Sequence, residues 1–143
     1  MTDQPRILVV DDDAPIRALV TKILERAGHA VDNARDGEEA IAMLDRTPYA
    51  VMVIDLMMPK VDGYGVIAHL RQRNQRPAVI VITAGDSAAI RRLDGGLVHS
   101  VVRKPFEIDV LADLVSAAAK PSSDERAEQP DQNVVPFRRD GMS

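Results

Sequence analysis

The sequence predicts an α/β fold in which a parallel sheet carries helices on both faces. Its apolar runs are short and non-alternating, which is typical of strands buried on both faces. Segments with the apolar spacing of helices separate these runs, so that a strand–helix pair occurs five times along the chain. The clear runs are residues 7–10, 51–54, 79–82 and 101–102, and a weaker one is 30–33.

The first unit is a strand over residues 7–10 followed by an amphipathic helix. Asp13 is predicted to cap this helix, Pro15 suits its first turn, and Gly28 fits the position just after its end. The apolar face of the helix follows the expected spacing of three and four residues. That face consists of Ile16, Leu19, Val20, Ile23 and Leu24.

The next two units repeat this order. Residues 30–33 give the weaker second strand, and a second helix opens at Asp36. A third strand is predicted over residues 51–55, and a third helix from Asp62 to about Arg73. The residues of the second helix that are expected to face the core are Ala40, Ile41, Met43 and Leu44.

The last two units lead into a polar tail. The fourth strand follows Pro77, and a short, poorly patterned helix is predicted over residues 87–93. The final helix has a clear apolar face formed by Ile108, Leu111, Leu114, Val115 and Ala118. From residue 121 the sequence is polar and charged and contains prolines. We therefore expect one folded domain over residues 1–120 and a disordered tail over residues 121–143.

Composition limits the classes of function. The chain has 143 residues and a net charge of −4, which favours one domain and argues against a basic nucleic-acid footprint. It has no cysteine, which excludes disulfides, zinc thiolates and thiol catalysis. Residues 1–5 lack the pattern of a secretory signal, and no apolar stretch is long enough to span a bilayer. We expect a cytoplasmic protein with no membrane insertion and no direct contact with nucleic acid.

Polar residues stand where the apolar runs end. Asp11 and Asp12 follow the first strand, Asp55 ends the third, Thr83 follows the fourth, and Lys104 comes just after the fifth. Because the carboxyl ends of parallel strands meet at one edge of a sheet, these groups are expected to lie together. Clustered carboxylates repel one another unless a cation holds them. The pattern indicates a divalent metal and a phosphoryl group at this edge.

Taken singly, each of these residues also has an ordinary structural explanation. The aspartates over residues 11–13 suit a helix cap, Asp55 suits a turn, and Lys104 suits a solvated surface. The functional interpretation depends on their joint occurrence at strand ends.

Together these segments resemble the receiver domain of two-component response regulators. The motifs occur in the family's order and cover residues 6–120. They are Ile7 to Asp12, Asp55 with Met58-Pro59 and Asp62-Gly63, Thr83-Ala84, and Lys104-Pro105-Phe106. The resemblance implies a flavodoxin-like (βα)5 three-layer sandwich with the parallel strand order 2-1-3-4-5. In that order the ligand site lies between strands one and three.

The resemblance also assigns roles to the acidic residues. Asp55 is the phosphoacceptor, a carboxylate nucleophile that forms an acyl phosphate. Mg²⁺ is held by Asp11, Asp12, Asp55 and the backbone carbonyl of Met57. Mg²⁺ suits such a site, because it binds to few carboxylates and keeps several waters beside a phosphoryl oxygen.

The remaining roles fall to residues that follow strands four and five. Thr83 is expected to turn its hydroxyl toward the phosphoryl group, Lys104 to bind a phosphoryl oxygen, and the Lys104-Pro105 peptide to be cis. Receivers often carry an aromatic residue three positions before the lysine, and here that position is Val101. We therefore expect any switch to use Thr83 and backbone shifts without a large side-chain swing.

Two further positions bear on how long the acyl phosphate lasts. The residues two after Asp55 and two after Thr83 influence hydrolysis in this family by placing water. Here they are Met57 and Gly85, whose side chains cannot hydrogen-bond a water. We expect slow self-hydrolysis.

The implied function is that of a stand-alone response regulator. It would accept its phosphoryl group from a sensor histidine kinase or a histidine phosphotransfer protein and signal through a downstream protein target. Its only expected catalysis is Mg²⁺-dependent self-phosphorylation and self-dephosphorylation. One alternative is a scaffold that binds without phosphorylation. Another is a phosphatase of the haloacid dehalogenase type, which typically has a second aspartate where this chain has Met57.

Overall fold

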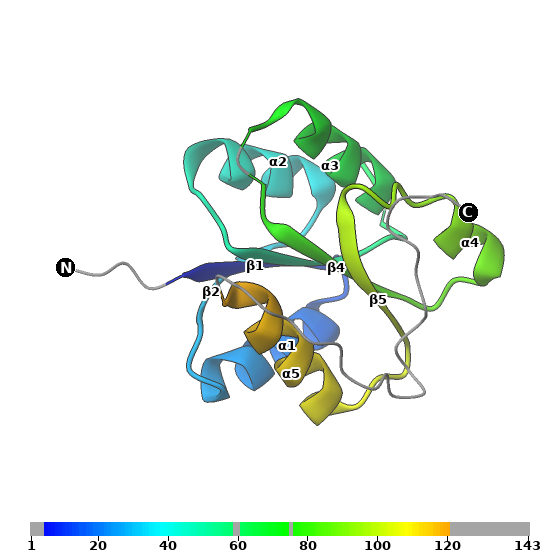
Figure 1. Ribbon diagram of the computed structural model, residues 1–143. Coiled ribbons are helices and arrows are strands. Elements are labelled where there is room, and N and C mark those ends of the chain that lie inside the picture. The colour runs from blue at the N-terminus through cyan, green and yellow to red at the C-terminus, as the bar shows by residue number, and fades with distance from the viewer. Residues whose placement is uncertain (1–4, 59–60, 75, 121–143) are drawn as a thin grey trace.

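A computed structural model describes residues 5–58, 61–74 and 76–120 (Figure 1). Five strands alternate with five helices, and a short 3-10 helix, η1 (Leu70–Gln72), follows the third helix. The strands are β1 (Arg6–Val10), β2 (Ala30–Ala34), β3 (Val51–Asp55), β4 (Ala78–Thr83) and β5 (Val98–Arg103). The helices are α1 (Ala14–Arg26), α2 (Gly37–Arg46), α3 (Gly63–His69), α4 (Ser87–Arg91) and α5 (Ile108–Ala119).

The five strands form one parallel sheet in the order β2-β1-β3-β4-β5. The chain reverses its direction of winding after β2, so β1 and β3 are neighbours at the switch point. The predicted flavodoxin-like class and its strand order are therefore confirmed.

Two apolar layers cover the two faces of the sheet. Helices α1 and α5 lie on one face and α2 and α3 on the other, which gives three layers (Figure 1). Alternate residues of each central strand enter different layers, because successive side chains of a strand point to opposite faces. In β1, Ile7 and Val9 pack toward α1 and α5, whereas Leu8 and Val10 pack toward α2 and α3.

Aspartates cap four of the five helices at the carboxyl edge of the sheet. The caps of α1 to α4 each accept a hydrogen bond from the backbone N–H three residues on. These residues are Asp13, Asp36, Asp62 and Asp86. At the other end of α1, Gly28 has φ of 96°, the left-handed conformation expected of a glycine that follows a helix.

Three element boundaries differ from the sequence prediction by two residues or more. The α-helical part of α3 ends at His69, and the chain continues to Gln72 as η1, which is the usual tightening of a last turn. Helix α4 ends at Arg91, two residues early, because the Leu93 N–H donates to the Ile90 carbonyl. Strand β5 begins at Val98, earlier than the apolar run indicates, because backbone pairing with β4 does not require apolar side chains.

Some predictions concern residues outside the described ranges. These are Pro59 in the Met58-Pro59 motif and the tail over residues 121–143. None of the helices in the described ranges has the length and apolar content needed to cross a lipid bilayer.

A glycine at the start of α3 brings this helix against the end of β3. A Cβ at Gly63 would lie 2.7 Å from both the Asp55 carbonyl oxygen and the Leu56 Cα. Both are backbone atoms, so the strand itself would have to move. The Gly63 N–H also donates to the Leu56 carbonyl at 2.9 Å.

We predict that Gly63→Ala destabilises the fold by about 1–3 kcal/mol, the usual range for overpacking. Urea denaturation measures this change. Gly65→Ala is the matched control on the same helix, because its Cβ would meet side-chain atoms and no backbone atom: Val61 Cγ1 at 2.9 Å and Asp62 Oδ1 at 3.8 Å. The control is expected to change stability little or to raise it. Equal losses in both variants would contradict this account.

Candidate functional site

Three carboxylates gather where β1 and β3 end. Asp55 is the last residue of β3, and Asp11 directly follows β1, its neighbour in the sheet. One carboxylate oxygen from each of Asp11, Asp12 and Asp55 lies within 4.8 Å of the others. Asp11 and Asp55 are buried and Asp12 is exposed, so the cluster reaches solvent on the side of Asp12.

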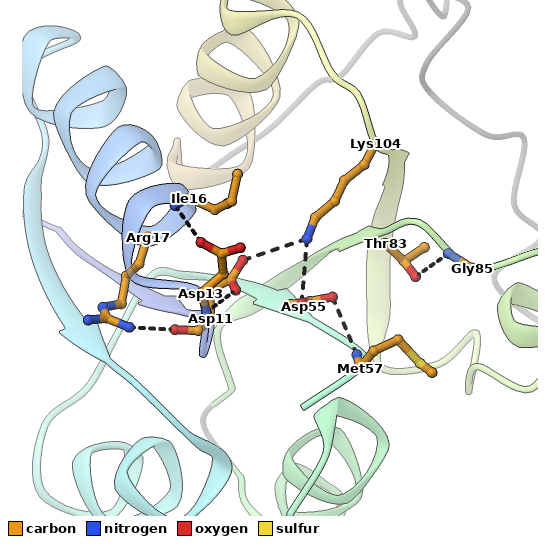
Figure 2. Close-up of polar contacts among 9 residues, drawn as sticks. All are labelled: Asp11, Asp13, Ile16, Arg17, Asp55, Met57, Thr83, Gly85 and Lys104. Atoms are coloured by element: carbon orange, nitrogen blue, oxygen red, sulfur yellow. Dashed lines mark hydrogen bonds and ion pairs between the residues drawn. The ribbon is translucent and has the colours of Figure 1, made fainter. Parts of the chain in front are cut away.

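The Lys104 ammonium faces this cluster. Its Nζ lies 3.5 Å from Asp55 Oδ2 and 3.9 Å from Asp11 Oδ2 (Figure 2). Lys104 follows β5, so its side chain reaches across the end of β4 to the two carboxylates. The ammonium therefore bridges the two buried carboxylates.

Backbone N–H groups hold the other oxygen of each buried carboxylate. The Asp13 N–H donates to Asp11 Oδ1 at 2.9 Å, and the Met57 N–H donates to Asp55 Oδ1 at 3.3 Å. Each carboxylate thus presents Oδ2 to Lys104 and Oδ1 to a backbone donor. Both backbone donors lie in the loops that directly follow β1 and β3, two residues after the carboxylates that they bond.

Burial makes the ionised cluster unfavourable in the absence of a metal. Burial raises the pKa of the Asp11 carboxyl, and the Asp55 and Asp12 charges raise it further, while the Asp13 N–H and Lys104 act in the opposite sense. Burial also raises the pKa of Asp55, against the effects of Lys104 and the Met57 N–H. One ammonium does not balance the desolvation and mutual repulsion of these groups.

The donor set fits a hard divalent cation. Its side-chain donors are carboxylate oxygens, which Mg²⁺ prefers, and the open side at Asp12 leaves room for water. The arrangement is therefore compatible with Mg²⁺. That the backbone carbonyl of Met57 is a further ligand stays a prediction. Met57 itself is 62% exposed.

Thr83 is fully buried at the end of β4, and its hydroxyl is already engaged. Its Oγ1 accepts a hydrogen bond from the Gly85 N–H at 2.9 Å, and Figure 2 shows the hydroxyl turned toward Gly85. Its carbonyl accepts the Lys104 N–H at 2.9 Å, which fixes the start of the β5–α5 loop. The Lys104-Pro105 peptide in that loop is cis, as predicted.

Two arginines that the sequence analysis did not single out support the site. Arg17 Nη1 donates to the Asp11 carbonyl at 2.7 Å (Figure 2), and Arg103 Nη1 donates to the Gly85 carbonyl at 2.9 Å. Arg17 lies one turn into α1, where helical side chains lean toward the N-terminus. The short sequence separation of Arg17 and Asp11 could therefore have predicted this contact. The contact of Arg103 with Gly85 joins residues 18 apart, and no local sequence pattern predicts it.

Residues 7–116 match the family model of the response regulator receiver domain. This chain is a member of the receiver-domain family. Its motifs, its fold and the acidic cluster at the switch point all agree with that membership.

Curated relatives of this receiver are longer proteins. It is 33% identical over 139 residues to the transcriptional regulatory protein ResD of Bacillus subtilis, covering 95% of this chain and 58% of ResD. It is 39% identical over 108 residues to the transcriptional regulatory protein TcrA of Mycobacterium tuberculosis, covering 74% of this chain and 42% of TcrA. The receiver thus spans about half the length of these relatives.

Solved receiver structures resemble it closely. The receiver domain of the Francisella response regulator 1452 has a TM-score of 0.74 and 32% identity, and the match covers 80% of this chain and 96% of that one. The response regulator TrrA of Thermotoga maritima, solved with Mg²⁺-BeF, has a TM-score of 0.72 and 32% identity, covering 80% and 98%.

We predict that Asp55→Asn raises the free energy of unfolding of the metal-free protein at pH 7. A carboxyl whose pKa is raised by folding destabilises the fold when it ionises, so its effect appears above the unfolded pKa and grows as pH rises through the folded pKa. The difference between variant and wild type should therefore shrink as pH falls. Urea denaturation in a chelator at pH 7 and pH 5 measures it.

Asp12→Asn provides the comparison, because Asp12 is exposed and should give a smaller gain. A wild type that is more stable than Asp55→Asn at pH 7 would show that Lys104 outweighs the burial of this carboxylate.

Proposed function

We propose that this receiver accepts a phosphoryl group on Asp55 from a phosphohistidine of a sensor kinase or phosphotransfer protein. One observation carries the proposal. The buried Asp55 carboxylate has an ammonium 3.5 Å away and two further carboxylates close enough to share a cation. A nucleophilic anion beside groups that neutralise an incoming anion is what phosphoryl transfer requires.

The chemistry follows from these contacts. An Asp55 oxygen attacks phosphorus, a P–O bond forms, and the P–N bond of the phosphohistidine breaks with its electron pair leaving on the imidazole. Lys104, which is partly exposed, can follow a phosphoryl oxygen without leaving the site, because it already bridges Asp11 and Asp55. The Met57 N–H, 3.3 Å from Asp55 Oδ1, keeps the carboxylate oriented.

Mg²⁺ on Asp11, Asp12 and Asp55 would supply the positive charge that lets a carboxylate approach an anionic donor. The raised pKa values of Asp11 and Asp55 support this role, since a bound cation stabilises the ionised carboxylates that burial, and to a smaller extent the neighbouring negative charges, disfavour. The proposal limits catalysis to self-phosphorylation and self-dephosphorylation at this site.

We propose that output passes through protein contacts that change on phosphorylation. The net charge of −4 supports a receiver that does not itself contact DNA. The relatives ResD and TcrA are named as transcriptional regulators, and this receiver matches only about half of each. We propose that DNA contact in such proteins belongs to the part outside the receiver. A single-domain, cytoplasmic mode of action stays a prediction from the sequence.

The two alternatives lack support of this kind. A phosphatase of the haloacid dehalogenase type would place a second acid at Met57, but that side chain is apolar and exposed. A scaffold that binds without phosphorylation has no need of two buried carboxylates with raised pKa values.

We predict that incubation with acetyl phosphate and Mg²⁺ adds one phosphoryl group to the wild type and none to Asp55→Asn, because the amide is not a nucleophile. Intact-mass spectrometry measures the gain. Asp36→Asn is the matched control, since it makes the same substitution at the cap of α2, where asparagine caps equally well. Phosphorylation that persists in Asp55→Asn would sink the proposal.

We further predict that the acyl phosphate hydrolyses slowly once the donor is removed. Neither Met57 nor Gly85 offers a side-chain group that orients an attacking water. Introducing Met57→Asn or Met57→Glu should shorten the lifetime, because either side chain can hydrogen-bond a water. A wild-type lifetime of only seconds in a time course of intact mass would contradict this prediction.

A further inference from the structure

Helix α4 is short and depends on outside contacts for its position. It has five residues, and its buried side chain is Ile90. A helix of this length is not stable alone, because nucleation costs more than a single turn returns. Few other elements of the described chain approach its backbone closely. The side-chain contacts of α4 therefore determine its position.

Tyr64 of α3 makes one such contact. In a regular α-helix the Leu93 N–H would donate to the Ala89 carbonyl. Here it donates to the Ile90 carbonyl at 3.0 Å, so the Ala89 carbonyl can accept from a side chain. The Tyr64 hydroxyl donates to that Ala89 carbonyl at 2.7 Å. It thus satisfies one of the unpaired carbonyls that end every helix.

A second contact holds the same tyrosine in place. The Arg92 guanidinium lies over the Tyr64 ring, 4.2 Å from its centroid, in the geometry of a cation–π interaction. Arg71 of η1 also forms an ion pair with Asp94 at 2.8 Å, just after α4. Both contacts join the α3–η1 segment to the end of α4.

The start of α4 connects directly to the Thr83 hydroxyl. Gly85, whose N–H donates to Thr83 Oγ1, lies just before the α4 cap, and Asp86 caps the helix by accepting the Ala89 N–H. A Cβ at Gly85 would lie 3.0 Å from the Ala89 Cβ and 3.1 Å from Thr83 Oγ1. Ala89, Gly85 and the Thr83 hydroxyl therefore form one packed group, with Tyr64 bonded to its far end.

We propose that Tyr64 is a positioning residue for the phosphorylation switch. By bonding the Ala89 carbonyl at 2.7 Å, its hydroxyl holds α4 and the Gly85 N–H in place, and so keeps Thr83 Oγ1 hydrogen-bonded to Gly85. This proposal rests on the proposed function, and it takes the Thr83 hydroxyl to move from Gly85 toward the phosphoryl group. Position 101, where receivers often carry an aromatic, is a fully buried valine here and has no hydroxyl to bond α4.

The test is Tyr64→Phe, which removes the hydroxyl and keeps the ring under Arg92. Loss of one neutral hydrogen bond should raise the population of the released state by roughly 2- to 10-fold. If the released state is the one that reacts, the rate of phosphorylation by acetyl phosphate and Mg²⁺ should rise by about the same factor. The backbone amide resonance of Gly85 should move in the unphosphorylated variant, because its hydrogen bond to Thr83 is weakened.

Tyr49→Phe is the matched control. Tyr49 is the other tyrosine of the chain, and its hydroxyl donates to Asp32 at 2.7 Å on β2, away from α4. This variant loses a hydroxyl and some stability, but it should change neither the rate nor the Gly85 resonance. A second variant, Arg92→Gln, removes the cation from the Tyr64 ring and should move both readouts in the same direction as Tyr64→Phe, by less.

The outcomes separate the two proposals. A wild type that takes up no phosphoryl group would overturn the proposed function. In that case the Gly85 amide resonance of Tyr64→Phe would still test whether Tyr64 positions Gly85. If the wild type is phosphorylated and Tyr64→Phe matches it in rate and in the Gly85 resonance, the positioning role is wrong. A purely structural role would lower stability without increasing the rate, and that result would also overturn the inference.

Discussion

The central constraint on this molecule is the crowding of three carboxylates against one ammonium at the end of β1 and β3. A parallel sheet with the order β2-β1-β3-β4-β5 makes this crowding unavoidable, because it places the strand ends that carry Asp11 and Asp55 side by side. Two backbone N–H groups and Lys104 reduce the repulsion without removing it. The remaining imbalance favours the uptake of a cation and, with it, of an anionic group.

Most of the fold could be predicted because its signals are local. Buried strands with aliphatic runs, aspartates at helix starts and Gly28 after α1 each follow from a few neighbouring residues. The boundaries that were missed have two different causes. The early start of β5 comes from a tertiary contact, its pairing with β4, whereas the early end of α4 comes from a tighter last turn that the weak apolar pattern does not reveal.

The functional site, like the fold, could be predicted only in part. The positions of Asp11, Asp55 and Lys104 follow from strand ends, but the state of the Thr83 hydroxyl does not. Its bond to Gly85 depends on the path of the β4–α4 loop, and the contact of Tyr64 with Ala89 joins residues 25 apart in the sequence. Neither contact has a periodic or compositional signature, so only the structure shows that the Thr83 hydroxyl oxygen accepts the Gly85 N–H.

The second tyrosine of the chain, Tyr49, bonds the edge strand of the sheet and has a different consequence. Tyr49 and Arg6 both bond Asp32, and this carboxylate belongs to β2, the outermost strand on its side of the sheet. A short outer strand that carries Asp32 and Asn33 presents charge and amide groups where another chain would have to pair. Such a border resists the strand addition that leads to aggregation. Self-association along this margin is therefore discouraged by the same residues that anchor the strand.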